Sequence, residues 1–177
     1  MRKSLFVPLL LLAACGDGAA DEAAKQKAAA AEAAKKLQLA AGQWEATTEV
    51  TRFTKQDQAP KAAINAPVGT KSTVSQCISP EQTKEPPAVL LAGSDAYKCT
   101  YDNSYISGGT LNASIACKRA GLSGEVRMSI AGTYTADAIE AEQDLQTSLP
   151  GPGDANIISK LTARRTGDCT AAPSKSG

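Results

Sequence analysis

Alternating apolar and polar side chains run along the chain on both sides of Ser107-Gly108-Gly109. In a strand every second side chain points to the same face, and glycine readily adopts the positive φ that a tight turn requires. The pattern therefore predicts a β-hairpin at this point. Its expected facing pairs are Cys99 with Cys117, Tyr101 with Ile115 and Tyr105 with Leu111.

The same alternation indicates further strands before and after the hairpin. They are expected within residues 44–51, 70–78, 125–134, 139–145 and 157–165. In the last two, pairing Glu142 with Lys160 joins opposite charges and sets Leu145 against Ile157 on the other face of the sheet. The sequence predicts a mainly β fold: an antiparallel meander of about seven strands, in an open sheet or a partly closed barrel, with one short helix.

Helical and loop signals are confined to short segments between the strands. Ser79-Pro80-Glu81-Gln82 combines an N-cap residue, a proline at the first helical position and a glutamine three residues after the cap. The short helix is expected there, followed by another turn at residues 88–92. Residues 54–67 are polar and contain prolines, so we expect an exposed, mobile loop, and a second loop is expected near residues 148–155.

The first fifteen residues have the pattern of an export signal. A basic start precedes a short apolar run that ends in Leu12-Ala13-Ala14-Cys15, and the run is too short to span a bilayer. Its end is similar to the lipobox of bacterial lipoproteins, in which the cysteine is diacylated and becomes the mature N-terminus. Residues 1–14 are thus expected to be a lipoprotein signal peptide and Cys15 the lipidated residue; the alternative is an ordinary signal peptide with a chance cysteine.

The mature chain is expected to have three parts. Residues 15–41 comprise Cys15 and an alanine-rich stretch with the composition of a helical spacer, which predicts a semi-rigid tether. Residues 42–170 form the β domain, and residues 171–177 are expected to be a disordered tail. Two acyl chains anchor a protein stably, and Gly16 weakly favours the outer membrane, by analogy with the lipoproteins of enteric bacteria.

Composition narrows the function classes. The net charge is +1 with acids and bases interleaved, which lacks the basic footprint of a nucleic-acid-binding protein. The chain has no histidine, the commonest general base and metal ligand. Because no set of nucleophile, base and oxyanion donors can be assembled from the sequence, we expect no enzymatic activity, no metal and no cofactor.

Five cysteines fit an exported lipoprotein. With Cys15 lipidated, four remain for two disulfides in an oxidising compartment, and four cysteines allow three connectivities. The hairpin geometry favours Cys99 with Cys117, which leaves Cys77 with Cys169. A nucleophilic Cys169 would need a free thiol, which such a compartment disfavours.

Arg164 and Arg165 are the clearest polar candidates for a site. Adjacent strand residues face opposite sides of a sheet, so Arg165 is expected to face inward. There it would either anchor an anion or pair with a carboxylate such as Asp168, and we favour the pairing. Trp44 has two interpretations as well, a sugar-stacking surface or an anchor in the core, and the core is favoured.

A row of carboxylates on one strand is a further candidate. Glu140, Glu142 and Asp144 share a face, and paired carboxylates serve acid–base catalysis or bind a hard cation. Lys160 and Arg164 lie within reach of that row in the expected register. A solvated, charge-balanced face is therefore the favoured interpretation.

Several short motifs resemble a bacterial family known as a domain of unknown function, numbered 3617. The residues that carry the resemblance are Gly42-Gln43-Trp44-Glu45, Ser75-Gln76-Cys77, Cys99, Cys117 and Arg164-Arg165-Thr166-Gly167-Asp168-Cys169. The resemblance implies a secreted or lipid-anchored envelope location and a β-rich domain with disulfides. It implies no reaction and no catalytic residues.

These observations together lead to one functional expectation with two alternatives. We expect a non-enzymatic, periplasm-facing lipoprotein that binds an envelope protein partner or a small ligand and is anchored at the outer membrane through Cys15. One alternative is an inhibitor of an envelope hydrolase such as lysozyme, by analogy of architecture only. The other is a carrier of a lipid or hydrophobic metabolite, which would require an apolar cavity of at least about 300 Å³.

Overall fold

The computed structural model describes residues 22–29, 33 and 37–169. The chain divides into two compact units, residues 1–33 and 34–177. In the first unit residues 22–29 are helical, as the alanine-rich composition predicts. The expected signal peptide, Cys15 and the tail 171–177 lie outside the described residues.

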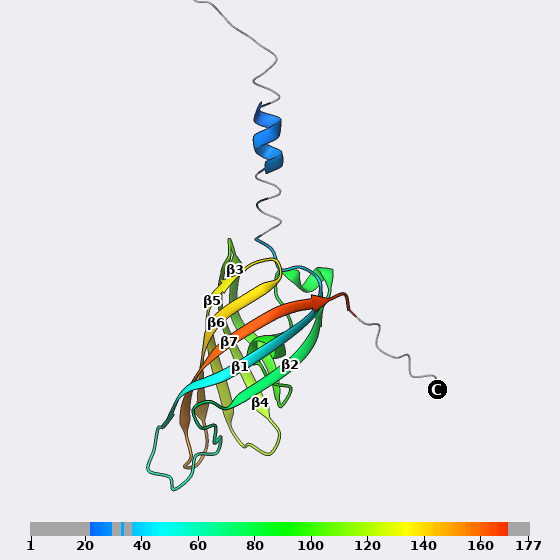
Figure 1. Ribbon diagram of the computed structural model, residues 1–177. Coiled ribbons are helices and arrows are strands. Elements are labelled where there is room, and N and C mark those ends of the chain that lie inside the picture. Colours follow the sequence, from blue (N-terminus) through cyan, green and yellow to red (C-terminus); the bar gives the residue numbers. More distant parts are fainter. Residues whose placement is uncertain (1–21, 30–32, 34–36, 170–177) are drawn as a thin grey trace, which may run out of the picture. The chain divides into compact units, whose positions relative to one another are not determined.

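The second unit is a seven-stranded antiparallel sheet curled into a half-barrel (Figure 1). Its elements are β1 (Gly42–Lys55), β2 (Lys71–Ile78), the 3₁₀ helix η1 (Pro80–Thr83), α2 (Ala88–Ala92), β3 (Tyr97–Ser107), β4 (Thr110–Arg119), β5 (Glu125–Tyr134), β6 (Ala138–Ser148) and β7 (Ala155–Gly167). This confirms the expected fold class. The order β2-β1-β7-β6-β5-β4-β3 joins the first and last strands side by side and leaves β2 and β3 as the two edges.

The concave face of the half-barrel holds the core. Along β4, β5 and β6 alternate side chains are buried, as the period-two pattern predicts. The short helix α2 contacts β1, β2 and β3, and its Leu90 and Leu91 are fully buried. The apolar concave face of an open sheet has to be covered, and α2, called the plug below, covers part of it.

The hairpin of β3 and β4 confirms part of the expected register. Cys99 faces Cys117 as predicted, but a bulge between Tyr101 and Asn103 shifts the remaining pairs by one residue. The predicted pairing of Tyr105 with Leu111 was therefore wrong. Tyr105 faces outward and is 59% exposed. A bulge adds one residue to one strand only, and such an insertion changes the face of every later side chain.

Residues 56–70, between β1 and β2, pack against the rest of the domain more closely than the sequence predicted. The expectation of an exposed loop was wrong for Ala59 and Ile64, which are 6% and 4% exposed. The Lys55 Nζ donates a hydrogen bond to the Ala59 carbonyl at 2.7 Å. The loop thus folds back and covers part of the concave face.

The tether ends earlier than predicted, because residues 37–41 are not helical. Leu39 is 2% exposed and belongs to the core, so the β domain begins before Gly42. At the other predicted helix start, Gln82 Oε1 accepts a hydrogen bond from the Ser79 N–H at 3.1 Å, and the element is a single 3₁₀ turn. None of the helices in the described part of the chain has the length and apolar character needed to cross a bilayer.

Candidate functional site

Polar side chains gather in two regions of the half-barrel. The first, here called the terminal junction, comprises Trp44, Arg165, Asp168 and the disulfide Cys77–Cys169, where β1 begins and β7 ends. The second, here called the concave cavity, lies farther along the same buried face of β1 and is bordered by α2. The two regions differ in how their polar groups are used, and each is described in turn.

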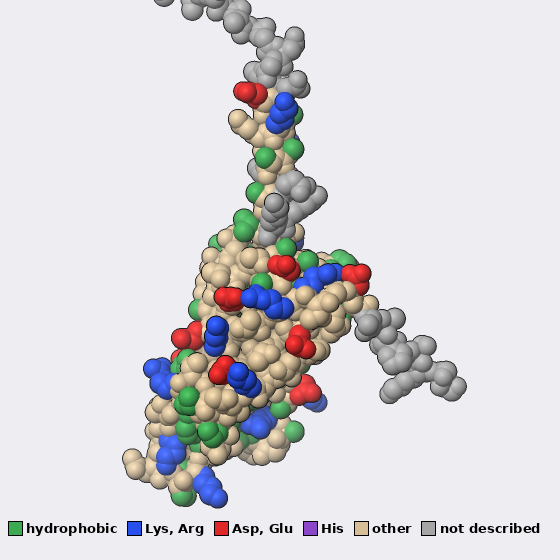
Figure 2. Space-filling view, viewed as in Figure 1, with side chains coloured by type: hydrophobic (Ala, Val, Ile, Leu, Met, Phe, Trp, Pro, Cys, Tyr) green, Lys and Arg blue, Asp and Glu red, His purple; other side chains and the backbone are tan. Residues whose placement is uncertain are grey.

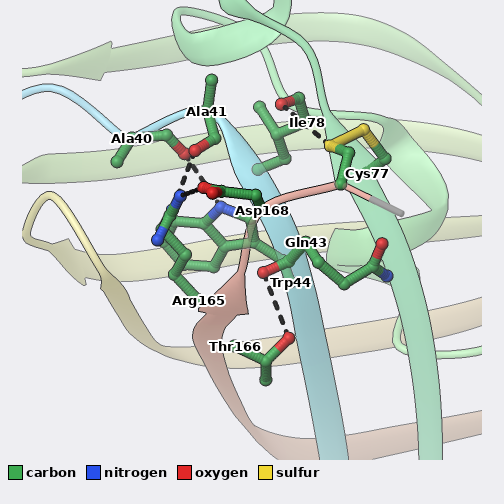
Figure 3. A network of polar contacts seen from close by, with 10 residues as sticks. Ala40, Ala41, Gln43, Trp44, Cys77, Ile78, Arg165, Thr166 and Asp168 are labelled. Atoms are coloured by element: carbon green, nitrogen blue, oxygen red, sulfur yellow. Dashed lines mark hydrogen bonds and ion pairs between the residues drawn. A yellow bond between two sulfur atoms is a disulfide. The ribbon is translucent and has the colours of Figure 1, made fainter. Parts of the chain in front are cut away.

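At the terminal junction, side-chain donors hold the strand that enters the domain (Figure 3). Trp44 is fully buried, and its Nε1 donates to the Ala40 carbonyl at 2.9 Å. Arg165 donates from Nε to the Ala41 carbonyl at 2.8 Å and from a terminal nitrogen to Asp168 at 2.6 Å. Arg165 thus pairs with Asp168, as the favoured interpretation held. A buried indole cannot stack on a sugar, so the core interpretation of Trp44 is confirmed.

Both disulfides form with the expected connectivity. Cys77–Cys169 links residues 92 apart in sequence and joins the end of β2 to the chain after β7. Cys99–Cys117 links residues 18 apart and crosses the β3–β4 hairpin. Since Cys169 is bonded, it has no free thiol for nucleophilic chemistry.

Gly42 is needed where β1 leaves the junction. Its φ is +143°, and a Cβ at this position would overlap the Gly167 carbonyl oxygen and the Arg165 guanidinium. Only glycine therefore allows β1 and β7 to approach each other here. The motifs around Trp44, Cys77 and Arg165 meet at this junction, whereas Cys99 and Cys117 lie in the β3–β4 hairpin; the contacts of both groups are structural.

The outer face of β6 and β7 carries the predicted row of acids. Glu140 accepts a hydrogen bond from Arg164 at 2.7 Å, with both side chains about half exposed. This contact with Arg164 lowers the pKa of the Glu140 carboxyl, with a smaller contribution from Lys160. Figure 2 shows side chains of both signs interspersed over this face. The arrangement agrees with a solvated, charge-balanced face rather than an acid–base pair.

The concave cavity has a volume of about 190 Å³ and is lined by side chains of the sheet, the plug and the β1–β2 loop. Ser159 of β7 lies between Val50 of β1 and Gln143 of β6 in the strand register. Ser159 and Gln143 are 4% and 3% exposed. Ile64 of the loop forms part of the wall. The cavity thus combines apolar walls with uncharged polar groups.

Some of those polar groups hold the plug in place. Gln143 Nε2 donates to the Leu91 carbonyl at 2.8 Å, and the Ser72 hydroxyl donates to the Gly93 carbonyl. The last carbonyls of a helix have no partner within it, so these bonds satisfy the end of α2. Gly93 has φ +67° and packs directly on Thr48. The end of α2 is therefore fixed against the sheet, and Ala92 of α2 forms part of the cavity wall.

Tyr97 and Arg119 are partly exposed lining residues of the cavity, and the part that they border is here called its mouth. They face each other at the start of β3 and the end of β4, and the guanidinium carbon lies 5.7 Å from the centre of the ring. Burial raises the pKa of the Tyr97 hydroxyl, while the nearby charge of Arg119 opposes that rise. Tyr97 is therefore a neutral hydrogen-bonding group at neutral pH, and Arg119 brings a positive charge to the cavity.

Hydrogen bonds to Asp57 fasten the loops at this end of the half-barrel. Its carboxylate accepts from the backbone N–H groups of Gly153 at 2.6 Å, Ala59 at 2.9 Å and Asp154 at 3.1 Å. The bond from Gly153 is the largest cause of a lowered pKa at Asp57. The β1–β2 and β6–β7 loops are thereby joined, and the cavity wall is held in position.

Sequence reasoning identified the residues of the terminal junction but not those of the concave cavity. One feature of the sequence could have indicated the concave cavity, namely polar residues on an apolar strand face. Thr48 and Gln143 occupy such inward positions among alternating apolar residues. Arg119 had no such signal, because its neighbours in space come from distant parts of the chain. Among residues 22–29, 33 and 37–169, no group of three or more His, Cys, Asp or Glu residues is placed to hold a metal ion.

Comparison with known proteins identifies the family alone. No curated protein matches the chain, and no solved structure matches it. A family model matches residues 39–169, an interval that begins at buried Leu39 and ends at the disulfide-bonded Cys169. It thus covers the complete half-barrel. The chain belongs to the family described as Protein of unknown function (DUF3617).

Proposed function

We propose that this protein is a non-enzymatic lipoprotein of the bacterial envelope that binds a small ligand in the concave cavity. The lipidated residue would be Cys15, and the β domain would face the periplasm from the outer membrane. The lipobox pattern of residues 12–15 supports the anchor, and two disulfides are typical of an oxidising compartment. The cavity itself, partly polar and left unfilled beneath the plug, is the observation that carries the proposal.

The lining of the cavity favours binding over catalysis. Its lining residues include no Asp, Glu, Cys or Lys, and the chain has no histidine. The lining therefore lacks a histidine, carboxylate or lysine to act as general base, and its serine and threonine hydroxyls have no such neighbour in the lining to activate them as nucleophiles. Its hydroxyl, amide and guanidinium groups are suited to hydrogen bonding and charge recognition.

The size of the cavity indicates a small molecule. Its volume of about 190 Å³ is below the roughly 300 Å³ at which pockets for drug-sized ligands begin, and below the limit set above for carriage of a lipid. At about 30 Å³ per water, it holds the equivalent of roughly six waters. A metabolite of a few carbon atoms fits this space, whereas a diacyl lipid does not.

The experiment is native mass spectrometry of the full-length lipoprotein, extracted with mild detergent from bacterial membranes. We expect a protein mass that matches a chain beginning at diacylated Cys15, and a bound species of low mass. Ser159→Leu, which extends a side chain into the cavity, should release the bound species. Thr162→Leu adds the same side chain at an outward position of β7 and should retain it, and thermal melts establish that both variants fold.

Three outcomes would contradict the proposal. An unmodified N-terminus would remove the anchor, and a wild-type protein without any bound low-mass species would remove the ligand. A stoichiometric hydrolase that accompanies both variants equally would favour the inhibitor alternative instead.

A further inference from the structure

The mouth of the concave cavity carries a positive charge that the rest of the described structure does not neutralise. Arg119 is the one charged side chain among the residues that line the cavity. The ion pairs within the described residues use Lys71, Arg127, Arg164 and Arg165 as their cations, and Arg119 is not among them. A guanidinium at the edge of a partly enclosed space, with no carboxylate within 4 Å in this set, is available to a ligand.

Tyr97 gives that guanidinium a defined position. The two residues are cross-strand partners, and the arginine lies over the ring at 5.7 Å. A guanidinium carries five N–H donors, so Arg119 keeps donors for a ligand in addition to any that it directs at the tyrosine. These donors form a planar fork that matches the two oxygens of a carboxylate.

Apolar and polar walls continue inward from the mouth. Leu145, Ile157 and Ile64 supply apolar surface, and Ser159 supplies a hydroxyl. The lining carries no acid that would repel an anion. The cavity therefore has a cation at its mouth, and its other lining residues are apolar or uncharged polar.

From this arrangement we infer that the ligand is a small carboxylic acid in its ionised form. Its carboxylate binds the Arg119 guanidinium, and its short carbon chain occupies the space beside Leu145 and Ile157. This inference deepens the proposed function and rests on it. Inorganic phosphate shares the charge but has no apolar part, so it uses the mouth without filling the cavity.

The test uses the full-length lipoprotein labelled with ¹⁵N in detergent micelles. Butyrate, its uncharged counterpart butyramide and inorganic phosphate are titrated separately, and amide shifts at residues 97, 119 and 159 report on the cavity. We expect butyrate to shift all three and to bind about tenfold more tightly than butyramide, because a charge-assisted pair is roughly twice as strong as a neutral hydrogen bond. Phosphate should bind more weakly than butyrate and leave residue 159 unshifted.

Substitutions separate the arginine from general charge effects. Arg119→Gln should reduce butyrate affinity about tenfold, to the level of butyramide, and Arg119→Lys should recover part of the loss. Arg127→Gln is the matched control, since Arg127 lies on β5 and pairs with Asp102 and Glu125 at the surface; it should bind butyrate like the wild type.

The outcomes distinguish this inference from the proposed function. Equal affinity for butyrate and butyramide, unchanged binding by Arg119→Gln, or no shift with butyrate would each overturn the carboxylate assignment. A native mass spectrum that still shows a bound, uncharged species would then leave the proposed ligand-binding function in place.

Discussion

The terminal junction and the concave cavity occupy the same concave face but use their polar groups differently. At the junction, Trp44 and Arg165 each donate to a backbone carbonyl of the entering chain, and a disulfide closes the region. At the cavity, Ser159 and Arg119 border an open volume of about 190 Å³. Polar groups that hydrogen-bond to the protein's own backbone stabilise the fold. Polar groups that line the cavity remain available to a ligand. We therefore expect substitutions at the junction to affect mainly stability and those at the cavity mouth to affect mainly binding.

Removal of the junction disulfide should give the largest effect. By the loop-entropy relation, a bond that closes 92 residues contributes about 4.6 kcal/mol, and one that closes 18 residues about 3.2 kcal/mol. The double variant Cys77→Ala with Cys169→Ala should thus be less stable in urea unfolding than Cys99→Ala with Cys117→Ala. The reverse order would show that the hairpin, and not the junction, sets the stability of the domain.

Truncation of Trp44 should give a loss of stability nearly as large as removal of the junction disulfide. Because the side chain is fully buried, Trp44→Ala should lower the free energy of unfolding by about 3–5 kcal/mol, as measured by urea unfolding with circular dichroism. At the cavity, Ser159→Ala should change it by less than about 0.5 kcal/mol, since it removes one hydroxyl beside open space. Comparable losses at the two positions would contradict the distinction between the two regions.

The plug borders the cavity, and substitution of Gly93 tests how closely its end packs on the sheet. An added Cβ at Gly93 would overlap the Thr48 side chain, whereas the same atom at Gly121 meets nothing within 4 Å, although both glycines have positive φ. Gly93→Ala and Gly121→Ala share the backbone cost, so their difference isolates the overlap. We expect Gly93→Ala to be less stable by roughly 1–3 kcal/mol in urea unfolding. Equal stability would mean that α2 shifts freely against the sheet.

The smallest effect is expected from acid at the loops beside the cavity. The Asp57 pKa is depressed below its ordinary value of 3.8, chiefly by the Gly153 N–H. A depressed carboxyl pKa contributes stability above the unfolded value, and that contribution is lost as the pH falls through the folded value. NMR should therefore show the Gly153 amide shifting below pH 3.8 while the Trp44 indole signal stays unchanged. Asp57→Asn should abolish this pH response, and a response that persists would assign it to another group.

Local pattern was sufficient for much of the fold. Period-two alternation identified the strands, since burial of one face imposes it directly on the sequence. Opposite charges and apolar contacts together specified the β6–β7 register, in which Glu142 does face Lys160 and Leu145 faces Ile157. The disulfide between Cys99 and Cys117 followed from hairpin geometry. The outward turn of Tyr105 did not, because a bulge adds one residue without changing the local composition.

The sequence by itself determined that alternate faces of the strands are buried, that four cysteines pair, and that Arg165 finds Asp168 within the same turn of chain. Only the tertiary structure decided that β1 lies beside β7, because hydrogen bonding between the first and last strands leaves no mark on their own residues. Gln143 and Ser159 already face each other in the β6–β7 register, but only the curl of the sheet brings Arg119 of β4 to the same cavity. A binding site assembled from such distant segments depends on how far the sheet curls and where the plug stops, and both follow from packing across the whole domain.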